Sequence, residues 1–271
     1  MKPFLYLAIS FLLTVHSGLA VAQELNGKTI MQKVYDRDRG KARLEAAQLT
    51  LVNPKGETRL RETLTLTSKT EGLELRLIRF TEPKDINRTT FLNLEKQEGD
   101  DDQYLYLPAY KQVRKISSSE RSRSFMGTDY TYEDILTRNV EADEHRFIKS
   151  EELDGRRTYL VESIPKNFDS SAYGRMLHWV LPDSWVILRS DFYDQRGLLQ
   201  KRYQALKLIQ SDPEKIWVVQ TSVMKNLLEN HQTTIDIKKL QLGHPEVEPQ
   251  LFTVQQLERR SYPEFQRNDL D

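Results

Sequence analysis

The segment RLRETLTLTSKTEGLELRLI, residues 59–78, indicates the class of the fold. It contains two runs in which leucines alternate with other, mostly polar residues. The leucines of the two runs are Leu60, Leu64, Leu66, Leu73, Leu75 and Leu77. A period of two places successive side chains on opposite faces of a β-strand. We therefore expect two half-buried antiparallel strands here.

Alternation of this kind continues outward from the segment. Further strands are expected at Ala42–Val52, Thr89–Leu94, Gln103–Leu107, Gln112–Ile116, Phe147–Leu153, Arg157–Ile164, His178–Leu181, Val186–Tyr193, Leu198–Ile209, Ile216–Lys225 and His231–Leu242. Turn sequences such as NPKG at residues 53–56 separate these runs. About eleven strands joined mostly by tight turns predict a meander in one curled antiparallel sheet. No Gly/Ser-rich linker divides the chain, so we expect one mainly β domain.

Helical signals are few and short. Residues Asn26–Arg39 predict an amphipathic helix with Ile30 and Val34 on its apolar stripe, Asn26 as its N-cap and Gly40 after its end. Other short helical or irregular stretches are expected at Pro83–Asn87, Ser118–Leu136, Asp169–Arg175 and Pro249–Glu258. These elements are candidates for lids over the sheet.

The number of strands bears on function. A closed sheet of about eight strands fills its interior with its own side chains, whereas a larger one leaves room for helices or a ligand. With so few helices, an apolar concave face favours a carrier of an apolar molecule. The alternative is that loops and helices fill the concavity completely. The residues expected to line the ligand cavity are Leu64, Leu66, Leu75, Leu77, Phe91, Leu105, Leu107, Val113, Phe125, Met126 and Trp217.

Residues Tyr104–Asp134 concentrate positive charge beside an apolar loop. The cations of this basic segment are Lys111, Arg114, Lys115, Arg121 and Arg123. Together with Phe125 and Met126 they could hold an anionic lipid head group or dock an acidic partner. The alternative is a solvated connector whose cations are balanced by Glu120 and by the acidic residues at 95–102.

The composition excludes several function classes. The 271 residues include 40 Lys and Arg against 40 Asp and Glu, so the chain lacks the positive charge typical of nucleic-acid-binding proteins. It contains no cysteine, which excludes disulfides, thiolate nucleophiles and cysteine-ligated metals. The histidines show no metal-ligand spacing, and no nucleotide-binding or GxSxG motif is present. We expect no metal, no cofactor and no catalysis, with His178 in a structural role.

The N-terminus predicts export. Lys2 is followed by an apolar stretch that is too short to span a bilayer, and the sequence Ala20-Val21-Ala22 fits a signal peptidase site. We expect a signal peptide at residues 1–22 and a mature domain at residues 23–271. An uncleaved membrane anchor is the alternative.

One string of residues resembles a known family. The motifs are YLPA at 106–109, VRKI at 113–116, FMGTDY at 125–130 and YED at 132–134, together with HWV at 178–180. This pattern is similar to that of the LolA-like outer-membrane lipoprotein-sorting proteins, which are periplasmic and often encoded beside RND or MMPL-type exporters. The resemblance implies an unclosed barrel lidded by helices that shelters acyl chains and contacts membranes transiently.

Two functions are therefore considered for the exported protein. The first is a periplasmic carrier that moves a lipid or lipidated protein from inner-membrane machinery toward the outer membrane. The second is an accessory subunit of an RND or MMPL-type export complex that docks through its basic segment.

Overall fold

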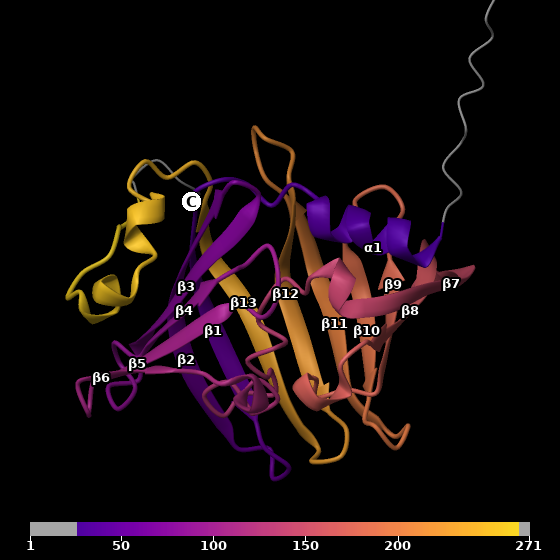
Figure 1. Cartoon of the computed structure of the whole chain (residues 1–271), viewed down its shortest axis with the longest axis horizontal. Helices are drawn as coiled ribbons and strands as arrows, with labels where there is room; N and C mark the ends of the chain where they lie inside the picture. Colours follow the sequence, from indigo (N-terminus) through magenta and orange to yellow (C-terminus); the bar gives the residue numbers. More distant parts are fainter. Residues whose placement is uncertain (1–25, 266–271) are drawn as a thin grey trace, which may run out of the picture.

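The computed structural model describes residues 26–265, which form one open antiparallel sheet with short helices around it (Figure 1). The strands are β1 (Arg43–Val52), β2 (Thr58–Thr70), β3 (Leu73–Glu82), β4 (Thr90–Leu94), β5 (Asp102–Leu107), β6 (Gln112–Lys115), β7 (Asp143–Leu153), β8 (Arg156–Pro165), β9 (Arg175–Val180), β10 (Ile187–Tyr193), β11 (Leu199–Gln210), β12 (Trp217–Asn226) and β13 (His231–Gln241). The helices are α1 (Gly27–Asp36) and the 3-10 helices η1 (Ser118–Glu120), η2 (Val140–Ala142), η3 (Phe168–Ser170), η4 (Pro249–Leu251) and η5 (Val254–Glu258). The mainly β class and the curled, unclosed antiparallel sheet predicted from the sequence are confirmed. The two runs in residues 59–78 and the eleven further predicted ranges each overlap one of the 13 strands of the described chain, so the expected count of about eleven is too low.

The order of the strands leaves the sheet open and sends one long connection from edge to edge. β1 pairs with β13, and from this pair the sheet runs outward through β2 to β6 on one side and through β12 to β7 on the other. β6 and β7 are therefore the two edges, yet they follow each other in the chain. Residues 116–142, which we call the β6–β7 connection, must span from one edge to the other.

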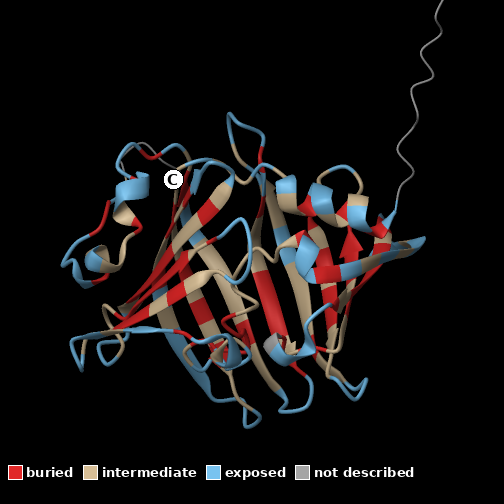
Figure 2. Ribbon diagram, viewed as in Figure 1, coloured by how far each residue is buried: buried red, intermediate tan, exposed pale blue. Residues whose placement is uncertain are grey.

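The pleat gives β1 to β5 two faces with different neighbours. Leu64 and Leu66 of β2 lie on what we call the outer face, which packs against the C-terminal segment of residues 244–262. The buried members of this outer cluster are Leu44, Leu66, Leu77, Leu92, Tyr106, Val247, Phe252, Leu257 and Tyr262. Figure 1 shows the C-terminal segment in yellow beside β3 and β4, and Figure 2 shows the buried positions of these strands in red. The opposite, inner face carries Thr63 and Thr65 of β2.

Aromatic residues fix the β6–β7 connection on the inner face of β3 to β5. The ring of Phe125 lies 5.5 Å from that of Phe91 and 5.4 Å from that of Tyr132, between ring centroids. All three rings are buried together with Phe80 and Leu105. Tilted and edge-on aromatic pairs of this kind add stability beyond the area that they bury.

Helix α1 covers the inner face at the other end of the sheet. Asn26 Oδ1 accepts a hydrogen bond of 2.9 Å from the Thr29 N–H, which confirms the predicted N-cap. Ile30 and Val34 are buried against β8 and β9. Gly27 lies so close to β7 that a Cβ atom would be 2.6 Å from the backbone nitrogen of Arg146, so only glycine fits there.

Two details differ from expectation or lie outside the structure. Helix α1 ends at Asp36, before the predicted end at Arg39, because the Arg39 guanidinium turns back and caps the carbonyls of Val34 and Tyr35. The stretch 118–136 agrees with expectation, because it is irregular apart from η1 and its polar groups bond locally. The predicted signal peptide at residues 1–22 lies outside the described residues, and none of the described helices is long and apolar enough to cross a bilayer.

Candidate functional site

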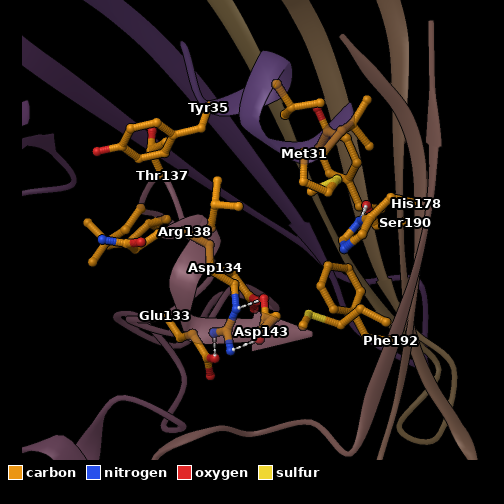
Figure 3. A pocket seen from close by; sticks show the side chains of 18 of the residues that line it. Met31, Tyr35, Glu133, Asp134, Thr137, Arg138, Asp143, His178, Ser190 and Phe192 are labelled. Atoms are coloured by element: carbon orange, nitrogen blue, oxygen red, sulfur yellow. Dashed lines mark hydrogen bonds and ion pairs between the residues drawn. The ribbon is translucent and has the colours of Figure 1, made fainter. Parts of the chain in front are cut away.

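Two adjoining cavities, of about 360 and 520 Å³, lie on the inner face of the sheet. We call them the small and the large cavity. Figure 3 shows the small cavity between α1, the β6–β7 connection and the strands that carry His178 and Phe192. The wall residues that the two cavities share are Arg37, Arg39, Arg76, Tyr130, Asp134, Ile135, Tyr203 and Val219. The shared walls make the two cavities neighbouring parts of one concavity.

Apolar side chains form much of both walls. Those of the small cavity include Met31, Val34, Leu136, Val186, Phe192 and Met224. Those of the large cavity include Ala47, Leu49, Ile78, Phe125, Ile235 and Ile237. Each CH₂ group that a ligand buries against such walls contributes roughly 0.8 kcal/mol. The site can therefore hold hydrocarbon chains by area alone, without a reactive group.

One end of the large cavity is polar. Four arginines lie there, Arg37 and Arg39 in the linker after α1, Arg43 at the start of β1, and Arg76 on β3. We call them the arginine cluster. Burial, followed by the repulsion of neighbouring arginines, lowers the pKa of Arg37 to about 10 and that of Arg43 to about 9. Both guanidinium groups still carry their charge at neutral pH.

Buried ion pairs attach the β6–β7 connection to the edge strand β7. Both the Nε and Nη2 atoms of Arg138 donate to the Asp143 carboxylate at 2.6 Å, and Nη1 donates to Glu133 (Figure 3). Burial alone would lower the pKa of Arg138, but its hydrogen bonds and charge contacts with Asp143 and Glu133 raise it above its ordinary value. Removing one partner would leave a buried charge unpaired, which typically costs about 3–5 kcal/mol.

A second attachment joins the connection to the middle of the sheet. The Tyr173 hydroxyl donates to Asp134 at 2.8 Å, and Lys201 Nζ lies 3.7 Å from an Asp134 oxygen. On β13, the Thr233 hydroxyl donates to the Asp129 carboxylate at 2.6 Å. The connection is therefore held at β7, β11 and β13 and forms a fixed cover over the inner face.

The two histidines that line the small cavity form hydrogen bonds with serines. Nδ1 of His178 lies 2.8 Å from Ser190 Oγ, and Nδ1 of His145 lies 2.7 Å from Ser163 Oγ. Burial lowers the pKa of His178 to about 4, so its imidazole is neutral at pH 7 and is a weak base. Among residues 26–265, no three His, Asp or Glu side chains come together as a metal site.

The structure separates the residues predicted to line the cavity into three groups. On the outer face, under the C-terminal segment, lie Leu64, Leu66, Leu75, Leu77 and Val113. On the inner face, in the aromatic cluster, lie Phe91, Leu105, Leu107, Phe125 and Met126, of which Phe125 also lines the large cavity. Trp217 starts β12 with 38 % of its surface exposed, and its carbonyl accepts a hydrogen bond from Arg37. The outer group differs from expectation because a segment distant in the sequence covers the leucine face, so the hollow lies opposite.

Most cations of the predicted docking surface are in ion pairs. Arg114 Nη1 lies 2.8 Å from Glu120, Lys115 Nζ lies 2.6 Å from Asp102, and Arg121 Nη1 lies 3.0 Å from Asp100. Arg123 reaches Glu120 at 3.7 Å. Lys111 stands in the exposed turn between β5 and β6. Glu120 within the basic segment and the aspartates that precede the segment thus balance much of its charge.

Sequence reasoning missed most residues that line the cavities, including Tyr203, Ile235, Ile237 and the arginine cluster. One signal was present, since Arg37, Arg39, Lys41 and Arg43 recur at every second position. A run of this kind is ordinarily solvated. The pairing of β1 with β13 on one side and with β2 on the other brings Ile235, Ile237 and Arg43 to the walls of one cavity.

One family model and several solved structures resemble the chain. Residues 72–259 match a family model described as "Uncharacterized protein", and no curated protein matches. A structure from Vibrio parahaemolyticus, named as an outer membrane lipoprotein-sorting protein domain, is 30% identical over 86% of this chain and 98% of its own, with a TM-score of 0.81.

Two further structures resemble the fold. A DUF1329 family protein from Desulfovibrio piger is 28% identical over 84% of this chain and 98% of its own, with a TM-score of 0.76. A LolA superfamily protein from Nitrosomonas europaea shares the fold at 18% identity over 84% of this chain and 98% of its own, with a TM-score of 0.66. On these matches, the chain belongs to the family of outer membrane lipoprotein-sorting protein domains and has the LolA-like fold.

Proposed function

We propose that this protein is a periplasmic carrier that shelters the acyl chains of a lipid or lipidated protein on the inner face of its sheet. The observation that carries the proposal is the pair of adjoining, largely apolar cavities between the sheet, α1 and the β6–β7 connection. Their volumes fall within the roughly 300–1,000 Å³ of typical ligand sites. The name of the Vibrio parahaemolyticus relative supports the same function.

Binding, and not catalysis, is the proposed activity. His178, which could act as a base near the small cavity, is engaged in a neutral hydrogen bond with Ser190. The carboxylates there are held by Arg138, Tyr173 and Lys201. A carrier needs a site without reactive groups, because its cargo must leave chemically unchanged. The cargo would travel between inner-membrane machinery and the outer membrane, with transient membrane contact at each end.

The proposed carrier is exported and docks on a membrane partner. Cleavage after Ala22 would release the mature domain into the periplasm. Tyr110 and Lys111 stand exposed in the turn between β5 and β6, next to the ion-paired part of the basic segment. We place contact with a membrane partner, such as an RND or MMPL-type transporter, at this turn.

Native mass spectrometry of protein purified from the periplasm tests the carrier function. We expect bound acyl-containing molecules, which extraction with organic solvent would release. The delipidated protein should then bind one equivalent of an environment-sensitive acyl probe, and phospholipid should displace it. A folded, delipidated protein that binds no probe would contradict the proposal and favour an accessory subunit whose concavity is filled.

A further inference from the structure

The arginine cluster has more positive charge than the carboxylates beside it neutralise. Arg43 is paired with Glu45, and Arg76 Nη2 lies 2.7 Å from Glu74. Arg37 forms no ion pair within residues 26–265, and its Nη1 donates to the Trp217 carbonyl at 3.1 Å.

Arg39 likewise has only backbone partners in the described chain. It donates to the carbonyls of Val34 at 2.8 Å and Tyr35 at 2.7 Å. The third carboxylate nearby, Glu95, already accepts from the Tyr35 hydroxyl and, at 2.6 Å, from the Glu74 N–H. These neutral donors leave Glu95 charged, so the four guanidinium groups face three glutamates, Glu45, Glu74 and Glu95, while Arg37 and Arg39 have no direct ion pair with any of them.

The aspartates beside the cluster do not neutralise it. Asp36 and Asp38 also line the large cavity, but both are exposed. Asp36 accepts a hydrogen bond from Gln32, and Asp38 accepts one from the Gly40 N–H at 2.8 Å. Neither forms an ion pair with a described arginine.

One buried donor of the cluster is unused. The Nε atom of Arg43 is shielded from solvent and has no hydrogen-bond partner among the described residues. Buried donors without a partner are rare, and they are commonly satisfied by water, an ion or a ligand. An anion would satisfy this donor and offset the burial and the mutual repulsion that lower the pKa of Arg37 and Arg43.

Polarity changes along β1 from this cluster into the cavity. Arg43, Glu45, Ala47 and Leu49 all line the large cavity. They lead from a charged end to an apolar end over roughly 20 Å, at about 3.3 Å per residue. This gradient has the polarity of a single-chain amphiphile with its head beside Arg43 and its tail beside Leu49.

We infer that the arginine cluster binds the phosphate or carboxylate head group of the amphiphile whose acyl chain occupies the cavities, so that the protein selects anionic over neutral cargo. The inference rests on the proposed carrier function. Guanidinium groups suit this task because their planar fork matches the oxygens of phosphate and carboxylate.

Titration calorimetry on delipidated protein tests the selection. The probes are palmitoyl lysophosphatidic acid, monopalmitoylglycerol with the same chain, and inorganic phosphate alone. Wild-type protein should bind the anionic lipid at least about tenfold more tightly than the neutral one, as expected for one charge-assisted hydrogen-bond pair. Inorganic phosphate should bind far more weakly than either lipid, because it has no acyl chain.

The variant Arg37→Gln separates head-group from chain recognition. It removes one hydrogen bond to a carbonyl and no ion pair, so the fold should persist. We expect about a tenfold loss for the anionic lipid and less than a twofold change for the neutral one. Arg196→Gln, at an exposed turn position, is the matched control and should change neither. Arg39→Gln should repeat the loss, with some destabilisation of α1.

The outcomes distinguish this inference from the carrier function. Equal wild-type affinities for the two lipids, or an equal loss of both in Arg37→Gln, would overturn head-group selection while leaving the carrier intact. Tight binding of phosphate without either lipid would indicate a free-anion site and overturn it as well. Binding of none of the probes would refute both proposals.

Discussion

The two faces of β1 to β5 are built from the same strands but are covered to different extents. On the outer face, leucines such as Leu66 and Leu77 are fully buried beneath the C-terminal segment. On the inner face, the aromatic cluster packs on β3 to β5, whereas threonines and a few aliphatic residues of β1 and β2 border the large cavity. The more apolar face is therefore the filled one, and the face with mixed polarity is hollow.

This contrast shows that alternation alone does not say where a ligand binds. A strand offers two faces, and distant segments decide which of them is covered. Here residues 244–262 fill the outer face, while the β6–β7 connection fills the inner face over β3 to β5 and leaves a cavity beside β1 and β2. A carrier requires a stable wall on one side and free volume on the other.

Truncation of an outer-face leucine should have the largest effect on stability. Leu66→Ala removes a side chain with no exposed surface, so we expect a loss of about 2–5 kcal/mol in the free energy of unfolding. Leu60→Ala, on the same strand and face but 54 % exposed, is the matched control and should cost less than about 0.5 kcal/mol. Urea denaturation measures both. Similar losses in the two variants would show that the outer face is not the structural wall.

The inner face should make stability depend on pH. The pKa of His178 is about 4 in the folded protein and about 6.5 when unfolded, so below pH 6.5 the unfolded chain binds the proton first. Stability is therefore retained above pH 6.5 and should fall by about 2 kcal/mol between pH 7 and pH 5. In His178→Asn this share of the pH dependence should vanish. An unchanged slope in the variant would mean that His178 titrates normally.

Neighbouring valines on β12 allow the two kinds of packing to be compared directly. Val219 lines both cavities, whereas Val218 is buried in a cluster with Ile216 and Leu240. Val219→Trp should weaken binding of an acyl probe by about tenfold or more with less than about 1 kcal/mol of destabilisation, because space already exists. Val218→Trp should instead destabilise by about 1–3 kcal/mol and leave probe affinity intact. The reverse pattern would place the hollow on the other face.

The smallest effect on folding is expected at the basic segment. The side chains of Arg114 and Lys115 are 42% and 59% exposed, and exposed ion pairs contribute little to stability. Charge reversal at Lys111, Arg114 and Lys115 should leave the urea midpoint and acyl-probe affinity unchanged. It should slow transfer of cargo to membranes or a partner and flatten the salt dependence of that transfer. A loss of acyl binding with normal transfer would contradict the assignment.

The sequence was sufficient for the fold but not for the walls of the cavity. The period-two leucines, the turn signals and the Asn26 cap predicted the strands and α1, because these features depend on neighbours in the chain. Which face of the sheet is hollow could not be predicted, since the alternation does not tell which distant segment will cover Leu64 or Thr63. The arginine cluster was missed for the same reason, because it assembles from the linker after α1, from β1 and from β3 only in the folded sheet.

Photo-crosslinking tests the central claim that cargo lies on the inner face. A palmitic acid carrying a diazirine near its terminal carbon would be bound to delipidated protein, irradiated and mapped by peptide mass spectrometry. We predict saturable labels on inner-face residues such as Leu49, Val219 and Ile235, with unlabelled palmitate competing. Labels concentrated on Leu66, Leu77 or residues 247–262, or labels that do not saturate, would contradict the claim.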